Sequence, residues 1–236
     1  MRTASPWKKG MAALSALLIV GSVAAFGSGE VEVEEWYNPQ SVGDLVAAVR
    51  EMDWSWTQFE GDVEKDTLAV SYRLVGPEVV AGEDTTLVEL VMDGETARVW
   101  LAEDDSIAQL EMGGELVPLA WMPAEQIEMM MTAYFWPFMM VEAFPVEEVA
   151  TGVYQGVSID SVDTEVREIG DLEVPVHRFE VSVSGEPHLE PGERVDYVWA
   201  IGDFGTFQMV VEWQWAGGDT GEEIAFNIQV ERVVLR

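Results

Sequence analysis

Residues 85–101, TTLVELVMDGETARVWL, show the pattern that dominates the chain. Residues 85–92 and 95–101 are apolar-rich runs on either side of Asp93-Gly94, and such a pair between two runs indicates a two-residue β-hairpin turn. Residues 106–112 and 115–119 flank Gly113-Gly114 in the same way. The sequence therefore predicts antiparallel strands joined by tight turns.

Alternation of apolar and polar residues predicts further strands around these hairpins. Residues 67–74 alternate strictly, as do 178–183 and 224–231, while Val210 is the one apolar intruder in 206–215. A period of two turns one face of each strand toward the core and the other toward solvent. We expect about ten strands in all.

Two segments have helical spacing instead. The first begins at Ser41 and is followed by an apolar stripe of Val42, Leu45, Val46, Val49 and Met52. The second is 121–144, WMPAEQIEMMMTAYFWPFMMVEAF, with Pro123 in its first turn and Pro137 as a break. We predict an α+β fold: one strongly curved antiparallel sheet, a half-open barrel, covered on its concave face by two main helices. Two β-sandwiches with a linker near residues 145–151 are the alternative.

The N-terminus has the pattern of an export signal. Arg2, Lys8 and Lys9 precede the uncharged segment 11–26, and small residues follow it. We predict a signal peptide over 1–27, an acidic linker over 28–40 and one domain over 41–236, located in the periplasm or outside the cell. An uncleaved membrane anchor is the alternative.

The charge balance is strongly acidic. The chain has 12 Lys and Arg against 44 Asp and Glu, a formal net charge of −32. Phosphate binding needs a basic stripe, so we expect no nucleic-acid partner. A lysine-poor acidic surface suits high external salt, which screens self-repulsion, and we interpret it as salt adaptation. The chain has no cysteine, which excludes disulfides, thiolate metal sites and a lipobox cysteine.

No motif for a reaction is present, and we expect neither an enzyme nor a cofactor. His177 and His188 stand in different local settings without metal-ligand spacing. The 44 acidic residues offer many carboxylate pairs, and none stands out. The acidic residues around Gly217–Gly221 are interpreted as a hairpin tip rather than a calcium loop. We therefore predict no metal site.

A methionine cluster is the most distinctive local feature. Six of the 12 methionines lie between residues 122 and 140, interleaved with aromatic residues at helical spacing. Such a stripe indicates a core helix or an adaptable apolar surface, because methionine is flexible and polarizable. Cu(I) binding by thioethers is a further alternative.

The order of the predicted elements resembles a family of lipid carriers. An amphipathic helix, a meander, a central apolar helix and long strands such as 177–215, HRFEVSVSG…VDYVWAIGDFGTFQMVVEW, follow one another. This order is similar to the lipoprotein carriers typified by LolA and the related LppX-type lipid carriers. The resemblance implies a half-open barrel under helices, with acyl chains held in the apolar space between.

Two apolar surfaces are candidates for that ligand. On the central helix and on the inward face of one long strand, we expect contact from Met130, Met131, Tyr134, Phe135, Phe138, Phe207, Met209, Val211, Trp213 and Trp215. The predicted function is an exported carrier of a lipid or of the acyl chain of a lipoprotein, with peripheral membrane contact allowed. The alternative is a non-enzymatic envelope protein with a filled core.

Overall fold

The computed structural model describes residues 42–61, 63–123, 127, 135–137, 157–184, 194–217 and 224–236. The predicted signal segment, the acidic linker and His188 lie outside these residues, as do most of 121–144 and the loop 218–223.

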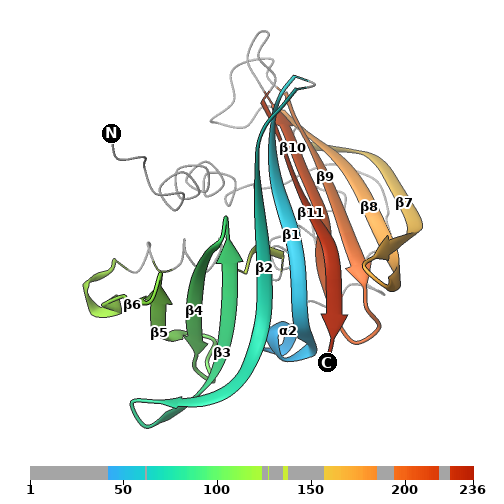
Figure 1. The fold of residues 1–236 in the computed structure, drawn as a ribbon. Helices are drawn as coiled ribbons and strands as arrows, with labels where there is room; N and C mark the ends of the chain where they lie inside the picture. Colours follow the sequence, from blue (N-terminus) through green and yellow to red (C-terminus); the bar gives the residue numbers. More distant parts are fainter. Residues whose placement is uncertain are drawn as a thin grey trace, which may run out of the picture.

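Eleven strands of the described part of the chain form one antiparallel sheet (Figure 1). The first half contributes β1 (Val49–Glu60), β2 (Val63–Val80), β3 (Glu83–Met92), β4 (Glu95–Leu101), β5 (Ile107–Met112) and β6 (Glu115–Leu116). The second half contributes β7 (Val157–Ile169), β8 (Leu172–Ser184), β9 (Arg194–Asp203), β10 (Gln208–Gly217) and β11 (Ile224–Leu235). Consecutive strands are neighbours within each half, so each half is a meander.

The first and last strands join the two halves. β1 pairs with β11 along its length, with Trp54 opposite Val230 and Trp56 opposite Ile228. The strand order β6-β5-β4-β3-β2-β1-β11-β10-β9-β8-β7 leaves β6 and β7 as the two edges. The sheet is therefore open, and its central strands come from opposite ends of the chain.

The two predicted hairpins are confirmed. Asp93 and Gly94 both have positive φ, at 50° and 79°, and they connect β3 to β4. Gly113 and Gly114, at 59° and 86°, connect β5 to β6 in the same way. Two consecutive positive φ values match the right-handed twist of the flanking strands.

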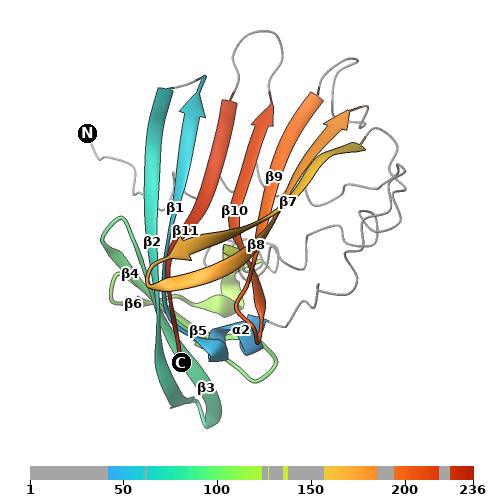
Figure 2. The same cartoon turned by 90° about the vertical axis from the view of Figure 1, so that its right-hand side faces the viewer.

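The β7–β8 hairpin folds back over the second half of the sheet (Figure 2). The backbone N–H of Gly170, in its turn, donates to the carbonyl of Glu231 on β11 over 3.0 Å. Arg167 on β7 donates to the carboxylate of Glu212 on β10. Both contacts join the hairpin to strands that are not its neighbours in the sheet, β10 and β11. The turn of this hairpin therefore lies against one face of the sheet.

The prediction of an α+β fold under two main helices is wrong. The described residues are almost entirely strand; their helical elements are α2 (Val42–Ala48) and the single 3₁₀ turn η2 (Leu119–Trp121), and the isolated described positions 127, 136 and 137 are helical as well. The predicted first helix stops at Ala48, because Val49 and Met52 belong to β1. Short apolar runs fit both helical and strand periods. Pairing with β2 and β11 on both sides gives the β1 backbone its hydrogen bonds.

Candidate functional site

Large aromatic side chains gather on one face of the central strands. Residues that pair across antiparallel strands project to the same side, so the register defines this face. Trp213 pairs with Trp199 and Ile228, and Ile228 pairs with Trp56. Trp215 pairs with Tyr197 and Phe226 in the adjacent row. We call the surface formed by Trp54, Trp56, Tyr197, Trp199, Trp213, Trp215, Phe226 and Ile228 the aromatic face.

Burial on the aromatic face decreases along the strands. Trp54 and Trp213 are only 3% and 2% exposed. Trp56 is half-buried in the same row as Trp213, and Trp215 and Phe226 are half-buried in the row nearer the β1–β2 tip. The ring of Phe226 stacks between those of Trp56 and Trp215, with centroids 5.5 and 5.3 Å away. This stack of three rings is the accessible end of an otherwise buried surface.

Two residues of the central segment reach the same side of the sheet. The ring of Trp136 lies 5.8 Å from that of Trp213 on β10, and the ring of Phe135 lies 6.5 Å, edge-on, from that of Tyr72 on β2. Both central-segment residues are buried. The segment therefore contacts both halves of the sheet at these two rings.

The predicted site residues are only partly brought together. Phe135, Trp213 and Trp215 lie on this side of the sheet. Met130, Met131, Tyr134 and Phe138 lie outside the described residues.

A β-bulge between Val210 and Glu212 breaks the expected alternation of β10. Val210 pairs with Ile201 on the aromatic side, whereas Met209 pairs with Gly202 on the other side. A Cβ on Gly202 would meet the side chain of Val211, which places Val211 on that other side too. Phe207 precedes the strand. The inward face predicted for this segment is thus divided between the two sides of the sheet.

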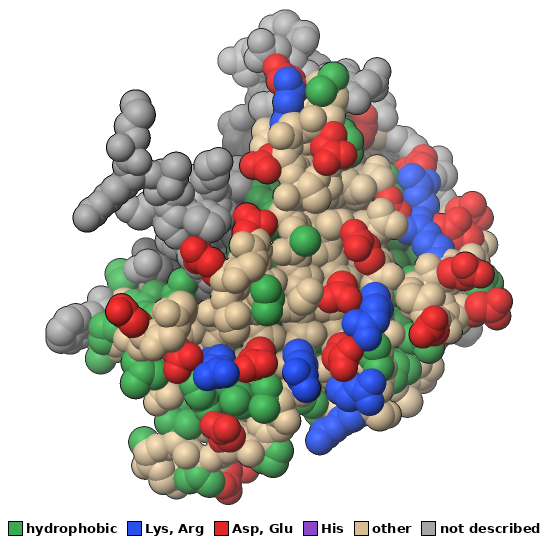
Figure 3. All heavy atoms as spheres, in the orientation of Figure 1, with side chains coloured by type: hydrophobic (Ala, Val, Ile, Leu, Met, Phe, Trp, Pro, Cys, Tyr) green, Lys and Arg blue, Asp and Glu red, His purple; other side chains and the backbone are tan. Residues whose placement is uncertain are grey.

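The opposite face carries paired charges and is drawn toward the viewer in Figure 3. Arg232 bridges Glu51 and Asp53 with N–O distances of 2.6 and 3.1 Å. Arg98 bridges Glu89 and Glu111 at 2.9 and 3.5 Å. The hydrogen bond from Arg232 is the main cause of a lowered pKa at Glu51. No residue that defines the aromatic face carries a charge, so the two faces differ sharply in polarity.

Three indole N–H groups on the aromatic side have no hydrogen-bond acceptor within the described part of the chain. These buried donors belong to Trp56, Trp136 and Trp213. By contrast, the indole of Trp100 on β4 donates to Glu78 over 2.8 Å. Buried indole N–H groups usually have a partner, so three exceptions on one surface require an explanation.

The other candidate groups of the sequence do not form a site in the described part of the chain. The described residues contain no group of three or more His, Asp or Glu side chains placed to hold a metal ion. Burial lowers the pKa of His177, which lies 3.3 Å from the hydroxyl of Thr164. The residues described include no helix of the length and apolarity needed to cross a membrane.

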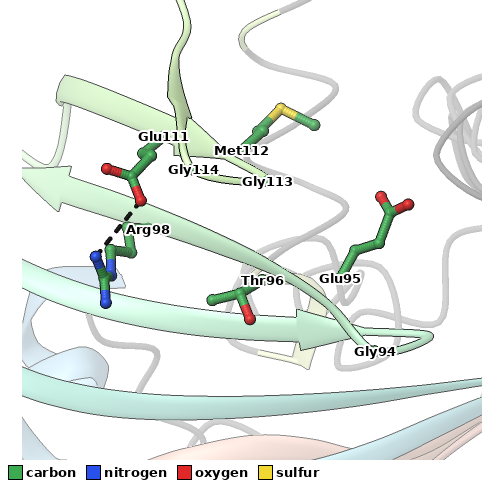
Figure 4. A pocket seen from close by; sticks show the side chains of 8 residues that line it. All are labelled: Gly94, Glu95, Thr96, Arg98, Glu111, Met112, Gly113 and Gly114. Atoms are coloured by element: carbon green, nitrogen blue, oxygen red, sulfur yellow. Dashed lines mark hydrogen bonds and ion pairs between the residues drawn. The ribbon is translucent and has the colours of Figure 1, made fainter.

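An open depression of about 580 Å³ lies between the β3–β4 and β5–β6 turns (Figure 4). Its polar lining includes Glu95 and the ion pair of Arg98 with Glu111. None of the predicted ligand-contact residues lines it. Arg98 already faces two carboxylates there, so it offers no free cation to an anionic ligand.

The chain matches no protein-family model and no curated protein. Two solved structures resemble it weakly. One is a predicted lipoprotein from Parabacteroides distasonis, with 8% identity, a TM-score of 0.22, and coverage of 84% of this chain and 98% of that one. The other is a predicted exported protein with a YmcC-like fold from Bacteroides fragilis, with 10% identity, a TM-score of 0.19, and coverage of 89% and 100%. Likenesses this low carry no argument about this chain, and the resemblance to LolA- and LppX-type carriers stays a prediction.

Sequence analysis missed several residues of the aromatic face. Trp54 and Trp56 alternate with Asp53, Ser55 and Thr57, which is the period of a strand. The helical spacing of the apolar residues up to Met52 obscured this signal. Trp136 lies in the predicted helical segment 121–144, and the sequence pattern there does not indicate which ring it contacts. Its contact with Trp213 depends on tertiary structure alone.

Proposed function

We propose that the protein is an exported, non-enzymatic carrier that binds the acyl chain of a lipid or lipoprotein on its aromatic face. The stack of Trp56, Phe226 and Trp215 carries this proposal, because these large rings stay half-buried on a sheet whose neighbouring positions are buried. Tryptophan and phenylalanine offer broad apolar area that grips a chain without dictating its shape. Export rests on the N-terminal signal pattern.

The polarity of the two faces supports the same assignment. Described arginines such as Arg232 and Arg98 are engaged with carboxylates on the charged face. An acyl chain that lies on the aromatic face contacts no charged group of that face. Its burial there is therefore favourable by roughly 25 cal/mol per Å² of apolar surface. The charged face stays toward solvent and keeps the acidic protein dispersed.

An exported structural protein with a filled core is the second candidate. The observation that favours it is the burial of Phe207, Met209, Val211 and Trp213, each at most 3% exposed. Side chains packed this closely leave no room for a ligand without movement. The two candidates predict opposite results in a binding experiment.

Native mass spectrometry of the purified mature protein, followed by titration with methyl 12-bromododecanoate, tests the carrier. Bromine quenches indole fluorescence, so binding at the aromatic face should dim the tryptophan emission. Phe226→Asp should abolish quenching by placing a charge between two rings, while Gln229→Asp on the opposite face of β11 should leave it intact. A protein that carries no lipid and shows no quenching at any probe concentration would establish the structural alternative.

A further inference from the structure

The three unpartnered indoles lie close together. Trp56 and Trp213 occupy one row of the sheet, because each pairs with Ile228 on the strand between them. Their strands are two spacings apart, about 10 Å. The ring of Trp136 lies 5.8 Å from that of Trp213. The three N–H donors therefore belong to one neighbourhood rather than to three scattered positions.

None of the described residues supplies an acceptor for these donors. The polar neighbours of Trp213 along β10, Glu212 and Gln214, are bonded to each other, and Glu212 also accepts from Arg167. Those residues lie on the opposite face, since they pair with Ala200 and Val198 rather than with the aromatic row. A buried donor without an acceptor costs about 1–3 kcal/mol. An acceptor delivered by a ligand would remove that cost.

The charge distribution indicates whether the group that accepts hydrogen bonds from these indoles is charged or neutral. The protein carries a net charge of −32, and no residue that defines the aromatic face is cationic. A carboxylate or phosphate head buried there would meet no counter-charge, which is strongly unfavourable. A neutral carbonyl accepts hydrogen bonds without that penalty.

We propose that the ligand is a neutral acyl ester, and that the indoles of Trp56, Trp136 and Trp213 donate hydrogen bonds to its carbonyl oxygens. This inference rests on the proposed carrier function and adds the chemical class of the head group. The half-buried stack of Trp56, Phe226 and Trp215 then holds the acyl chain. Reaching both Trp136 and Trp213 requires the ester to insert between their rings.

Two probes with the same hydrocarbon chain distinguish the contribution of the ester carbonyl to the binding affinity from the contribution of apolar contact. Methyl 12-bromododecanoate has an ester, and 1-bromododecane lacks it. One hydrogen bond to a previously unpaired donor should make the ester bind about five- to tenfold more tightly. Trp213→Phe and Trp136→Phe remove the N–H but keep an aromatic ring, so each should reduce this ratio toward one.

Trp100→Phe is the matched control. Trp100 is buried on β4 outside the aromatic face, and its indole N–H already donates to Glu78 over 2.8 Å. The substitution removes the same bulk and should leave the probe ratio unchanged. Near-ultraviolet circular dichroism checks that each variant is folded.

Spectra of the unmodified protein labelled with ¹⁵N-tryptophan give a second measurement that needs no variant. The indole N–H resonances of Trp136 and Trp213 should move downfield with the ester and not with the bromoalkane. Equal affinity for both probes, with no downfield shift, would overturn the ester assignment while leaving the carrier intact. Binding of neither probe would overturn the carrier itself.

Discussion

The hydroxyl of Tyr72 connects the helix α2 to the sheet. It lies 3.3 Å from the carbonyl oxygen of Val46 in α2, and the side chain is 1% exposed. Burial raises the pKa of this phenol well above its ordinary value of 10.0, because the charged form loses hydration. The neutral hydroxyl is therefore the form that the fold requires.

Tyr72→Phe should lower the free energy of unfolding by about 1 kcal/mol at about pH 8, since the Val46 carbonyl loses its donor. The pKa of the Tyr72 phenol is higher in the folded state than in the unfolded chain. The contribution of Tyr72 to the free energy of unfolding is therefore full below about pH 10, and it declines at higher pH because the phenol of the unfolded chain loses its proton. Urea unfolding at about pH 8 and about pH 11 measures both effects. The alkaline decline should be shallower in the variant, and an identical decline in both proteins would contradict the burial argument.

Among the elements, the β7–β8 hairpin has an unusual arrangement. Its turn residue Gly170 has φ of +61° and donates to the Glu231 carbonyl on β11. A Cβ at Gly170 would lie 3.1 Å from Cγ of Arg232. Both the backbone conformation and the close approach favour glycine at this position. The turn thus holds an edge hairpin against a central strand.

Gly170→Ala should loosen this hairpin without unfolding the rest of the sheet. A left-handed alanine costs about 1–2 kcal/mol, and the clash with Arg232 adds to it. Hydrogen exchange over residues 165–176 should accelerate about tenfold, with β1 and β2 unchanged. Gly114→Ala is the control, because its φ is +86° but its Cβ would meet nothing within 4 Å. Uniform acceleration across all strands would show that the hairpin does not open as a separate unit.

For the whole molecule, the excess of acidic residues determines the response to salt. Arg98, Arg167 and Arg232 each contact two carboxylates, yet the chain keeps a net charge of −32. Exposed ion pairs contribute at most about 1 kcal/mol each and weaken in salt. Self-repulsion of the remaining charge weakens in salt too, and it acts over the whole molecule.

Raising NaCl from about 0.1 M to about 2 M should therefore increase the thermal unfolding midpoint, by about 4–8 °C if repulsion costs about 2 kcal/mol. Differential scanning calorimetry measures the shift. Glycine betaine at matched osmolality is the control, because a zwitterion does not screen charge. A midpoint that falls with NaCl would mean that the ion pairs outweigh the repulsion.

Much of the sheet could be predicted because its signals are local. Asp93-Gly94 and Gly113-Gly114 specify their turns by backbone conformation, and the alternation of 178–183 and 224–231 marks strands that the structure contains. The β10 bulge could not be predicted, because it depends on how Val210 and Glu212 pair with β9. The four candidate residues outside the described part of the chain remain predictions.

The sequence by itself determined many of the strands, where the two hairpin turns fall, and that the chain is acidic. These properties follow from backbone preferences and side-chain polarity over a few residues. Only the tertiary structure decided that β1 pairs with β11, which places Trp56 and Trp213 in one row. It likewise decided that Trp136 meets Trp213, and neither indole N–H finds an acceptor among the described residues. The physical reason is that pairing between distant strands depends on packing and hydrogen bonding across the whole sheet, which no local pattern encodes.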